Sequence, residues 1–301
     1  MSSLPLAIFV CGPTAVGKTA FAINLAKALQ TEIISFDARQ FYRELAIGAA
    51  PPSAEELREV PHHFIGHRSV KEPWNAHQFE QAALQKLQKL LDKYHQVVLV
   101  GGSGLYMQAL RRGLDPLPPA QEDHRNYWET QLREKGLASL QAALKGKDPQ
   151  YYAEADVQNP RRLIRALEVM ETTGQTYSQL RKRQGEQRPF RSLVLGLDMP
   201  RAQLYERINK RALTMLERGW LEEVKQLWPY RNAQALQTVG YRELFQYLEG
   251  GLSYPQAVET LQKNTRRYAK RQLTWFRHQE NPHWLGPKQH AEALHLISVC
   301  L

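Results

Sequence analysis

Residues 12–19 carry the pattern in this sequence that is most specific for a chemical task. They read GPTAVGKT, which matches G-x-x-x-x-G-K-[ST], and they lie between an apolar run at residues 6–10 and a helical pattern that starts at Lys18. Glycines let the backbone turn its amide N–H groups toward a phosphate, while the Lys18 ammonium and the Thr19 hydroxyl face the terminal phosphate and a phosphate-bound Mg²⁺. The alternative is a glycine-rich turn that binds nothing. We predict a diphosphate-binding site made of Gly12, Pro13, Thr14, Ala15, Val16, Gly17, Lys18 and Thr19, with Thr19 as the Mg²⁺ ligand.

Such a loop is usually accompanied by an acidic residue at a strand end, which holds the metal during nucleotide hydrolysis. The strand expected at residues 97–100 ends instead in Gly101-Gly102-Ser103-Gly104, without a carboxylate. This absence argues against a motor protein or a GTPase, although the motif by itself is one that binds ATP. It favours a loop that holds a diphosphate without hydrolysing it.

Two polar residues follow predicted strands at the same edge of the expected sheet. Asp37 follows the strand at residues 32–36, and Ser103 follows the strand at residues 97–100. The carboxyl ends of parallel strands form the edge at which open α/β sheets bind ligands. Asp37 is either an acid that faces a ligand or a turn residue, and Ser103 is either a site hydroxyl or the N-cap of the next helix. Both are candidate catalytic residues, with these structural alternatives left open.

The elements that must position these residues alternate between strand and helix. Apolar runs at residues 6–10, 32–36, 97–100 and 191–197 predict buried strands, and helical patterns lie between the first three. This order predicts an α/β fold with a P-loop NTPase-like core, in which helices flank a parallel sheet. Residues 122–184 show helical periodicity without a strong strand. We therefore predict a core of residues 1–115 and 190–301 and an inserted all-helical domain of residues 116–189.

The composition indicates a globular protein with a polyanionic partner. The 301 residues include 40 Lys and Arg against 30 Asp and Glu, a formal charge of +10, which suggests nucleic acid or another anionic surface. Two cysteines do not suffice for a disulfide framework or a cysteine-based zinc site. No apolar run approaches the roughly 20 residues of a membrane-spanning helix, and residues 1–5 lack the charged lead-in of a signal peptide. We expect a cytoplasmic protein without a membrane partner.

Two predicted helices concentrate the positive charge. The first starts at Asn159-Pro160 and carries Arg161, Arg162 and Arg165 on its outer face, spaced to follow a phosphate backbone. The second spans residues 263–277 and interleaves six Lys and Arg with three aromatic residues. A single arginine on a helix usually marks a solvated face, whereas a cluster of this density favours RNA.

The motifs, in their order, resemble those of the tRNA dimethylallyltransferases, also called tRNA isopentenyltransferases. The resemblance covers nearly the whole chain and rests on the segments GPTAVGKT (12–19), DARQFY (37–42), HH (62–63), GGSGLY (101–106), NPRRLIRALE (159–168), TVGYREL (238–244) and YAKRQLTWF (268–276). The chain departs from the family at Ala38, where the family usually has Ser, and at Ser103, where it usually has Thr. Because the two cysteines exclude the zinc-finger extension of the eukaryotic members, the resemblance is to the bacterial form.

The resemblance implies transfer of a dimethylallyl group from dimethylallyl diphosphate to N6 of the adenine immediately 3′ of the anticodon in tRNA. That amine is a poor nucleophile because the purine delocalises its lone pair, so a base must take its proton, and Asp37 is the acidic candidate beside the phosphate loop. Ser103 would hydrogen-bond the amine and the bridging phosphate oxygen. The loop amides, Lys18, Mg²⁺ on Thr19 and Arg211 would hold the departing diphosphate. For Arg211 a solvated helix arginine is the alternative.

The resemblance also implies how tRNA binds. The target adenine is stacked in the anticodon loop, so we predict that it is flipped into a channel between the two domains of a monomeric enzyme. His62, His63 and His67 are interpreted as structural or loop-contacting residues, because two adjacent histidines rarely bind one ion. The predicted tRNA-binding residues are Asp37, Ala38, Arg39, Gln40, Ser103, Arg125, Arg161, Arg162, Leu163, Ile164, Arg165, Gln237, Thr238, Val239, Gly240, Tyr241, Arg242, Arg267, Lys270 and Arg271.

Three other functions share parts of this pattern. A small-molecule kinase with a phosphate loop would use Asp37 to accept a substrate hydroxyl proton, but it would leave the basic helices without a role. An adenylate prenyltransferase would act on the free nucleotide. A non-catalytic RNA-binding protein would use a nucleotide as a switch, and Asp37 would then be dispensable.

Overall fold

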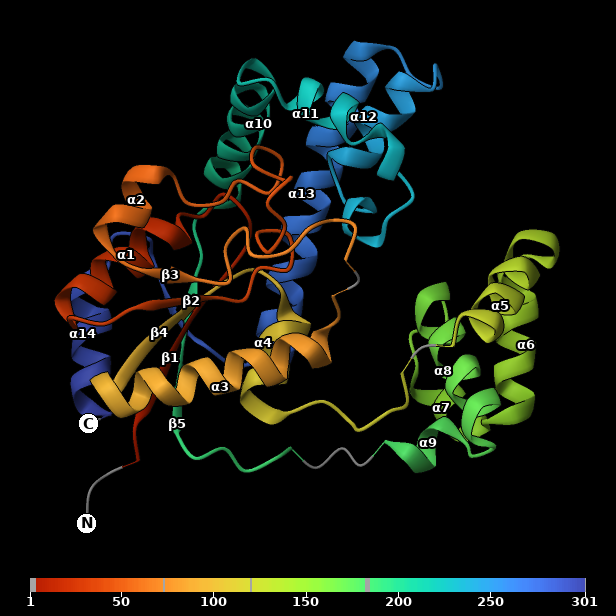
Figure 1. The fold of residues 1–301 in the computed structure, drawn as a ribbon, viewed down its shortest axis with the longest axis horizontal. Coiled ribbons are helices and arrows are strands. Elements are labelled where there is room, and N and C mark those ends of the chain that lie inside the picture. Colours follow the sequence, from red (N-terminus) through yellow and green to blue (C-terminus); the bar gives the residue numbers. More distant parts are fainter. Residues whose placement is uncertain (1–3, 73, 120, 182–184, 301) are drawn as a thin grey trace. The chain divides into compact units, whose positions relative to one another are not determined.

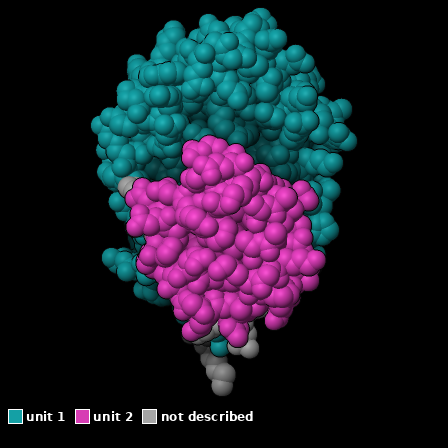
Figure 2. All heavy atoms as spheres, turned by 90° about the vertical axis from the view of Figure 1, so that its right-hand side faces the viewer, with its two compact units in different colours: residues 1–112, 187–301 teal, residues 113–186 magenta. Residues whose placement is uncertain are grey.

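The computed structural model describes residues 4–72, 74–119, 121–181 and 185–300. The chain forms two compact units, residues 1–112 with 187–301 and residues 113–186 (Figure 2). The sequence predicts an insertion at residues 116–189, and the structure divides the chain at 113–186. Gln184, the end of the predicted helical pattern, lies outside the described residues, as do residues 1–3.

The first unit is built on a six-stranded sheet with the order β3-β2-β4-β1-β5-β6, in which the neighbouring strands pair in parallel (Figure 1). The strands are β1 (Leu6–Cys11), β2 (Ile33–Ser35), β3 (His62–His63), β4 (Gln96–Val100), β5 (Arg191–Leu197) and β6 (His283–Leu285). The predicted α/β fold with a P-loop NTPase-like core is confirmed. The sequence does not predict β3 or β6, and the stretch around His62 and His63 is an edge strand rather than irregular.

Each face of the central strand β1 belongs to a different hydrophobic core. Ala7, Phe9 and Cys11 pack in the core that also holds buried residues of α3 (Ala76–Tyr94) and α4 (Gly104–Arg112). The alternate residues of β1 pack in a second core with α1 (Lys18–Ala28) and α14 (His290–Val299). Burying one large apolar side chain is worth about 1.5–3 kcal/mol. This two-sided packing fixes β1, and with it the start of the loop that follows at the carboxyl edge of the sheet.

The remaining helices of the first unit are α-helices and two short 3-10 turns. They are α2 (Ala54–Glu59), α10 (Arg201–Glu217), α11 (Trp220–Gln226), α12 (Tyr241–Leu248) and α13 (Tyr254–Gln279), with short 3-10 turns η1 (Trp228–Tyr230) and η2 (Gln234–Leu236). The 26-residue α13 starts at a Ser253 cap and buries one face, which carries Ala257, Leu261, Ala269, Gln272 and Phe276. Within the described part of the chain, no helix combines the length and the apolar character needed to cross a membrane.

The second unit contains helices and no strands in its described residues. It contains α5 (Glu122–Lys135), α6 (Leu137–Lys147), α7 (Pro149–Glu154), α8 (Pro160–Thr173) and α9 (Tyr177–Leu180). Its own core is formed mainly by Trp128, Leu140, Leu144 and the inner face of α8. The buried Asp148 caps α7 by accepting from the Tyr151 N–H (2.9 Å), and it accepts from the Ser178 N–H (2.7 Å), which ties α9 to α7. As the sequence predicts, α8 begins at Pro160 after Asn159.

Candidate active site

The loop from Gly12 to Gly17 connects β1 to α1 and curls over the Lys18 side chain. Gly12 has φ of +145°, and a Cβ there would lie 2.6 Å from the Leu197 carbonyl oxygen, so glycine is required. Lys18 Nζ donates to the carbonyl oxygens of Gly12 (3.1 Å) and Pro13 (2.8 Å). Burial lowers the pKa of Lys18 to about 8, and the Asp37 carboxylate opposes that shift. The Lys18 ammonium is therefore poorly solvated and suited to an anion.

Asp37 follows β2 and lies near Lys18. Both side chains lie next to Gly102, in the loop between β4 and α4. A Cβ built on Gly102 would lie 3.5 Å from Asp37 Oδ2 and 3.6 Å from Lys18 Nζ, so the carboxylate and the ammonium face one small space. The other carboxylate oxygen, Oδ1, accepts from the Arg39 N–H (3.2 Å). Asp37 thus acts both as the turn residue of the structural alternative and as an acid that faces the phosphate loop.

Arg211, on α10, belongs to the same group of charges. Burial lowers the pKa of Arg211, the nearby Asp37 carboxylate raises it, and the Arg207 guanidinium lowers it further. Arg207 itself donates to the Val16 carbonyl oxygen in the phosphate loop (3.4 Å). The structure therefore places Arg211 near Asp37 rather than on a solvated face, although the sequence leaves both alternatives open.

The Ser103 side chain contacts the main chain of the segment that follows Asp37. The Ala38 N–H donates to Ser103 Oγ (3.0 Å), and Ser103 directly precedes α4. Because the hydroxyl accepts this bond, its own hydrogen remains available to a second acceptor. The loop between β4 and α4 and the segment after β2 are thereby held together at the carboxyl edge of the sheet.

Two residues of α13 complete this site, and the sequence does not predict either. Gln272 is 7% exposed, accepts from the Thr14 N–H in the phosphate loop (2.9 Å) and donates to the Gly102 carbonyl oxygen (2.8 Å). Burial raises the pKa of Tyr268 to about 12, and the Asp37 carboxylate adds to that shift. A polar side chain among the apolar positions of the buried helix face was the only signal for Gln272.

The predicted tRNA segments at residues 37–40 and 237–242 are brought together. Arg39 donates to the Ala235 carbonyl oxygen (2.8 Å), two residues before Gln237. Gln40 accepts from the Ser35 hydroxyl (3.2 Å) and donates to the Ala50 carbonyl oxygen (3.1 Å). Half-buried Gln237, Thr238 and Val239 and exposed Arg242 follow η2.

Tyr241 requires a correction, because its side chain is fully buried and does not face an RNA. The Tyr241 hydroxyl donates to Glu223 (2.6 Å), which also accepts from the N–H groups of Ile47 (2.6 Å) and Gly48 (3.0 Å). Gly240, which precedes it, is buried too. Tyr241 therefore anchors the loop after the Asp37 segment to α11 and α12.

The exposed face of α13 carries a basic hollow of about 950 Å³. Arg267, Lys270 and Arg271 are exposed there, as the sequence predicts for an RNA-binding face. Other cations of the same helix have protein partners, because Arg266 donates to Asn209 (2.6 Å) and Arg277 donates to Asp198 (2.7 Å). The hollow is lined by Arg267, Lys270, Arg271, Thr274, Trp275, His278 and Gln279.

In the second unit, only part of the predicted RNA surface is exposed. Arg161 and Arg162 are exposed on α8. The side chains of Leu163 (0% exposed) and Ile164 (5% exposed) lie in the core of that unit, which corrects their prediction as tRNA contacts. An RNA does not reach side chains that the unit buries to fold.

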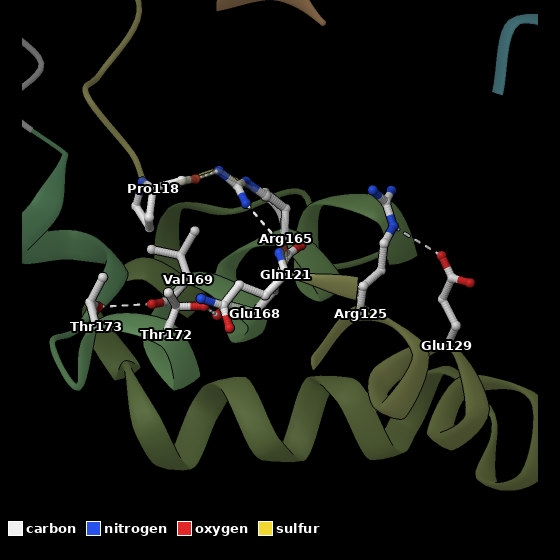
Figure 3. Close-up of polar contacts among 9 residues, drawn as sticks. All are labelled: Pro118, Gln121, Arg125, Glu129, Arg165, Glu168, Val169, Thr172 and Thr173. Atoms are coloured by element: carbon white, nitrogen blue, oxygen red, sulfur yellow. Dashed lines mark hydrogen bonds and ion pairs between the residues drawn. The ribbon is translucent and has the colours of Figure 1, made fainter. Parts of the chain in front are cut away.

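Arg165 and Arg125 have carboxylate partners in the second unit (Figure 3). Arg165 donates to the buried Glu168 (2.9 Å) and to the Pro118 carbonyl oxygen (2.5 Å). Glu168 also accepts from the Gln121 N–H (2.9 Å), so the pair fixes the segment that enters α5. Arg125 donates to Glu129 (3.2 Å) and is half-buried. Arg165 is thus committed to its own unit, whereas the pairing of Arg125 is of the weak surface kind.

The three histidines singled out by the sequence make contacts within the protein. His63 pairs with Glu32 (2.6 Å), and a ring nitrogen of His62 lies 2.8 Å from the Val60 carbonyl oxygen. His67 packs edge-on against Phe41, Phe64 and Trp74. These contacts fit the interpretation of the histidines as structural residues.

A family model described as IPP transferase matches residues 40–279. The tRNA dimethylallyltransferase 1 of Bacteroides thetaiotaomicron is 41% identical over 98% of this chain and 96% of the relative. The tRNA dimethylallyltransferase of Christiangramia forsetii is 44% identical over 92% of each chain.

Solved structures give the same result. A tRNA isopentenylpyrophosphate transferase from Bacillus halodurans superposes with a TM-score of 0.73 and is 36% identical, over 98% of this chain and 96% of that chain. A eukaryotic dimethylallyltransferase acting on tRNA superposes with a TM-score of 0.79 over 98% of this chain and 78% of that chain. At 24% identity, the second likeness is one of fold.

Proposed function

This chain belongs to the IPP transferase family, which includes the tRNA dimethylallyltransferases, and we infer that it transfers a dimethylallyl group from dimethylallyl diphosphate to tRNA. The acceptor is N6 of the adenine immediately 3′ of the anticodon, and diphosphate is released. The observation that carries this function is the position of Asp37 Oδ2 and Lys18 Nζ around Gly102, which places a base and an anion-holding cation at one small space. The relatives give no support to a kinase or to an enzyme of free adenylate.

The reaction needs one bond to form and one to break. The N6 lone pair attacks C1 of the dimethylallyl group, the bond between C1 and the bridging oxygen breaks, and diphosphate leaves with that electron pair. N6 then carries an extra proton, which Asp37 accepts as general base. Oδ1 of Asp37 is held by the Arg39 N–H, so Oδ2 is the oxygen directed to the reaction.

Negative charge on the departing diphosphate is met by fixed donors. These donors are the amides of the phosphate loop and the side chains of Lys18 and Arg211. Both side chains are poorly solvated, which strengthens their attraction for an anion. The half-buried Thr19 hydroxyl at the start of α1 suits Mg²⁺, which prefers oxygen ligands and takes most of them from phosphate and water. When bound, Mg²⁺ would neutralise part of the diphosphate charge.

Ser103 sits between the two substrates in this scheme. Its oxygen is held by the Ala38 N–H, so the hydroxyl hydrogen is free to donate to the bridging oxygen of the leaving group or to orient N6. A proton or hydrogen bond at the bridging oxygen makes diphosphate a better leaving group. Ser103 is therefore a catalytic residue in this proposal.

The anticodon stem-loop of tRNA binds to the cationic surfaces. Exposed Arg267, Lys270 and Arg271 on α13, together with residues 37–40, 237–239 and Arg242, lie on the first unit with the site, and exposed Arg161 and Arg162 lie on the second. We propose that the target adenine is flipped out of its stack to reach Asp37. A monomer in the cytoplasm, where tRNA is found, is sufficient for this reaction.

The decisive experiment combines the protein with dimethylallyl diphosphate, Mg²⁺ and an unmodified anticodon stem-loop RNA. We expect the RNA to gain the mass of one dimethylallyl group, located on the adenine 3′ of the anticodon after digestion to nucleosides. AMP in place of the RNA is the control for the free-nucleotide enzyme. No mass gain on RNA, together with phosphoryl transfer from ATP, would overturn the proposal.

A further inference from the structure

Gln272 joins the phosphate loop to the helix that carries the basic hollow. Its carboxamide accepts from the Thr14 N–H (2.9 Å) and donates to the Gly102 carbonyl oxygen (2.8 Å). A Cβ on Gly102 would lie 2.5 Å from Gln272 Nε2, so this approach depends on glycine at that position. Because Gln272 is only 7% exposed, water does not readily replace either bond.

The Thr14 N–H belongs to the loop whose amides would hold the diphosphate. One N–H makes one strong hydrogen bond, so the Gln272 carboxamide oxygen and a phosphate oxygen compete for it. A bond to an ionised acceptor is roughly twice as strong as one to a neutral amide oxygen, so the phosphate displaces the carboxamide when it binds. Gln272 then keeps only its bond to the Gly102 carbonyl oxygen.

The same region of α13 faces the acceptor side. Lys270 and Arg271 precede Gln272 and line the basic hollow together with Trp275, whose ring packs against the backbone of Gly104. Ala269 and Phe276 are fully buried and fix this stretch of helix. Gln272 and the residues that line the hollow are therefore carried by one ordered stretch of helix.

We propose that Gln272 is a positioning residue that couples the diphosphate site to the tRNA-binding face, so that each substrate changes the affinity for the other. This rests on the proposed function. Thermodynamic reciprocity requires the same factor in both directions, and coupling between sites is commonly about 5- to 150-fold. A purely structural Gln272 would contribute to stability and leave the two affinities independent.

The test measures the affinity for inorganic pyrophosphate with Mg²⁺ by calorimetry, with and without an anticodon stem-loop RNA. In the unaltered protein we expect the RNA to change this affinity at least about fivefold. Gln272→Met fills a similar volume without either hydrogen bond, and we expect the factor to fall to within about twofold of one. Gln262→Met is the matched control, because Gln262 lies on the same helix and donates to the Asn209 carbonyl oxygen outside the site (3.3 Å).

A second variant tests the competition for the Thr14 N–H. Gln272→Glu places a carboxylate on the phosphate loop, and we expect it to weaken pyrophosphate binding at least about tenfold while the unfolding temperature changes far less. A coupling factor of one in the unaltered protein, or an equal factor in Gln272→Met, would overturn the proposal. Dimethylallyl transfer by the unaltered protein is measured in parallel, so a failed coupling is distinguished from a failed function.

Discussion

The backbone N–H of Ala38 donates to the Ser103 hydroxyl over 3.0 Å. This bond joins the segment after β2 to the loop after β4, and it uses the main chain rather than the side chain at position 38. The alanine at that position, where the tRNA dimethylallyltransferases usually have serine, therefore leaves the bond intact. The hydrogen bond also fixes the Ser103 oxygen, so the hydroxyl hydrogen points away from Ala38.

Replacement of Ser103 tests whether that hydrogen is used in the reaction. We expect Ser103→Ala to lower kcat by about 10²- to 10³-fold, because a hydrogen bond to the leaving oxygen or to N6 is lost. Ser103→Thr keeps the hydroxyl and is expected to stay within about threefold of the unaltered enzyme. Equal activity of the alanine and threonine variants in the RNA mass assay would show that Ser103 serves only as a helix cap.

Removal of the Asp37 charge separates chemistry from binding. We expect Asp37→Asn to lower kcat by about 10²- to 10⁴-fold, the range for loss of a general base. Pyrophosphate binding is expected to persist or tighten, because the negative charge beside Lys18 is gone. Binding of the stem-loop RNA is expected to be retained. Full turnover in this variant would instead favour a non-catalytic protein with a nucleotide switch.

Lys18 predicts a pH dependence of diphosphate binding. Its pKa of about 8 lies below the ordinary value of 10.5, so the free protein loses this proton as the pH rises through 8. The diphosphate prefers the charged ammonium, so the affinity for diphosphate is highest below pH 8. Above pH 8 the affinity declines by up to tenfold per pH unit for one linked proton. Calorimetry with pyrophosphate from pH 7 to 9.5 measures this, and Lys18→Met should bind weakly with a flat profile. A steep decline that persists in Lys18→Met would assign it to another group.

The exposed arginines of α8 predict the salt dependence of RNA binding. We expect Arg161→Ala with Arg162→Ala to weaken binding of full-length tRNA and to reduce the slope of log affinity against log salt by about 0.7–0.9 for each lost phosphate contact. Fluorescence anisotropy across a salt series measures the slope. An unchanged slope would remove these two residues from the RNA surface.

Arg165 is expected to behave differently from its neighbours. Arg165→Ala leaves the buried Glu168 with the Gln121 N–H alone, and we expect a loss of about 1–3 kcal/mol in the unfolding free energy. The salt slope of tRNA binding should not change. Urea denaturation followed by circular dichroism tests the first expectation. A flattened slope at unchanged stability would return Arg165 to the set of phosphate contacts.

Tyr241 is another residue whose prediction as a tRNA contact the structure corrects, and it can be tested in the same way. Tyr241→Phe removes a buried hydroxyl that donates to Glu223, and we expect it to cost about 1.5–3 kcal/mol in the unfolding free energy. Tyr247→Phe, on the same helix and partly exposed, is the control and should stay within about 0.5 kcal/mol. If Tyr241→Phe is as stable as this control but binds tRNA more weakly, the original prediction of an RNA contact would stand.

The parts of the fold that the sequence predicts are those coded locally. β5 spans residues 191–197 as predicted, and β1 differs from its prediction by one residue, because continuous apolar runs mark buried parallel strands. β3 and β6 escape prediction because neither carries a continuous apolar run, whereas the equally short β2 contains Ile33 and Ile34.

The same limit applies to the site. The phosphate loop, Asp37 and Ser103 follow from motif and strand order, whereas Gln272 and Arg165 depend on which segment covers them. Helical spacing places Arg165 outside, and the earlier segment at Pro118 and Gln121 covers part of that face. A periodic pattern tells which face is polar but does not identify its partner.

The place of β1 in the sheet also constrains how the molecule is made. One edge of β1 pairs with β4, but Leu6 on the other edge pairs with Arg191, which follows the whole second unit. At about 5–20 residues per second, a ribosome needs several seconds or more to supply that partner after β4 has emerged. Until then the nascent chain exposes one side of its central strand, and the helical insertion has time to fold before the catalytic half is closed.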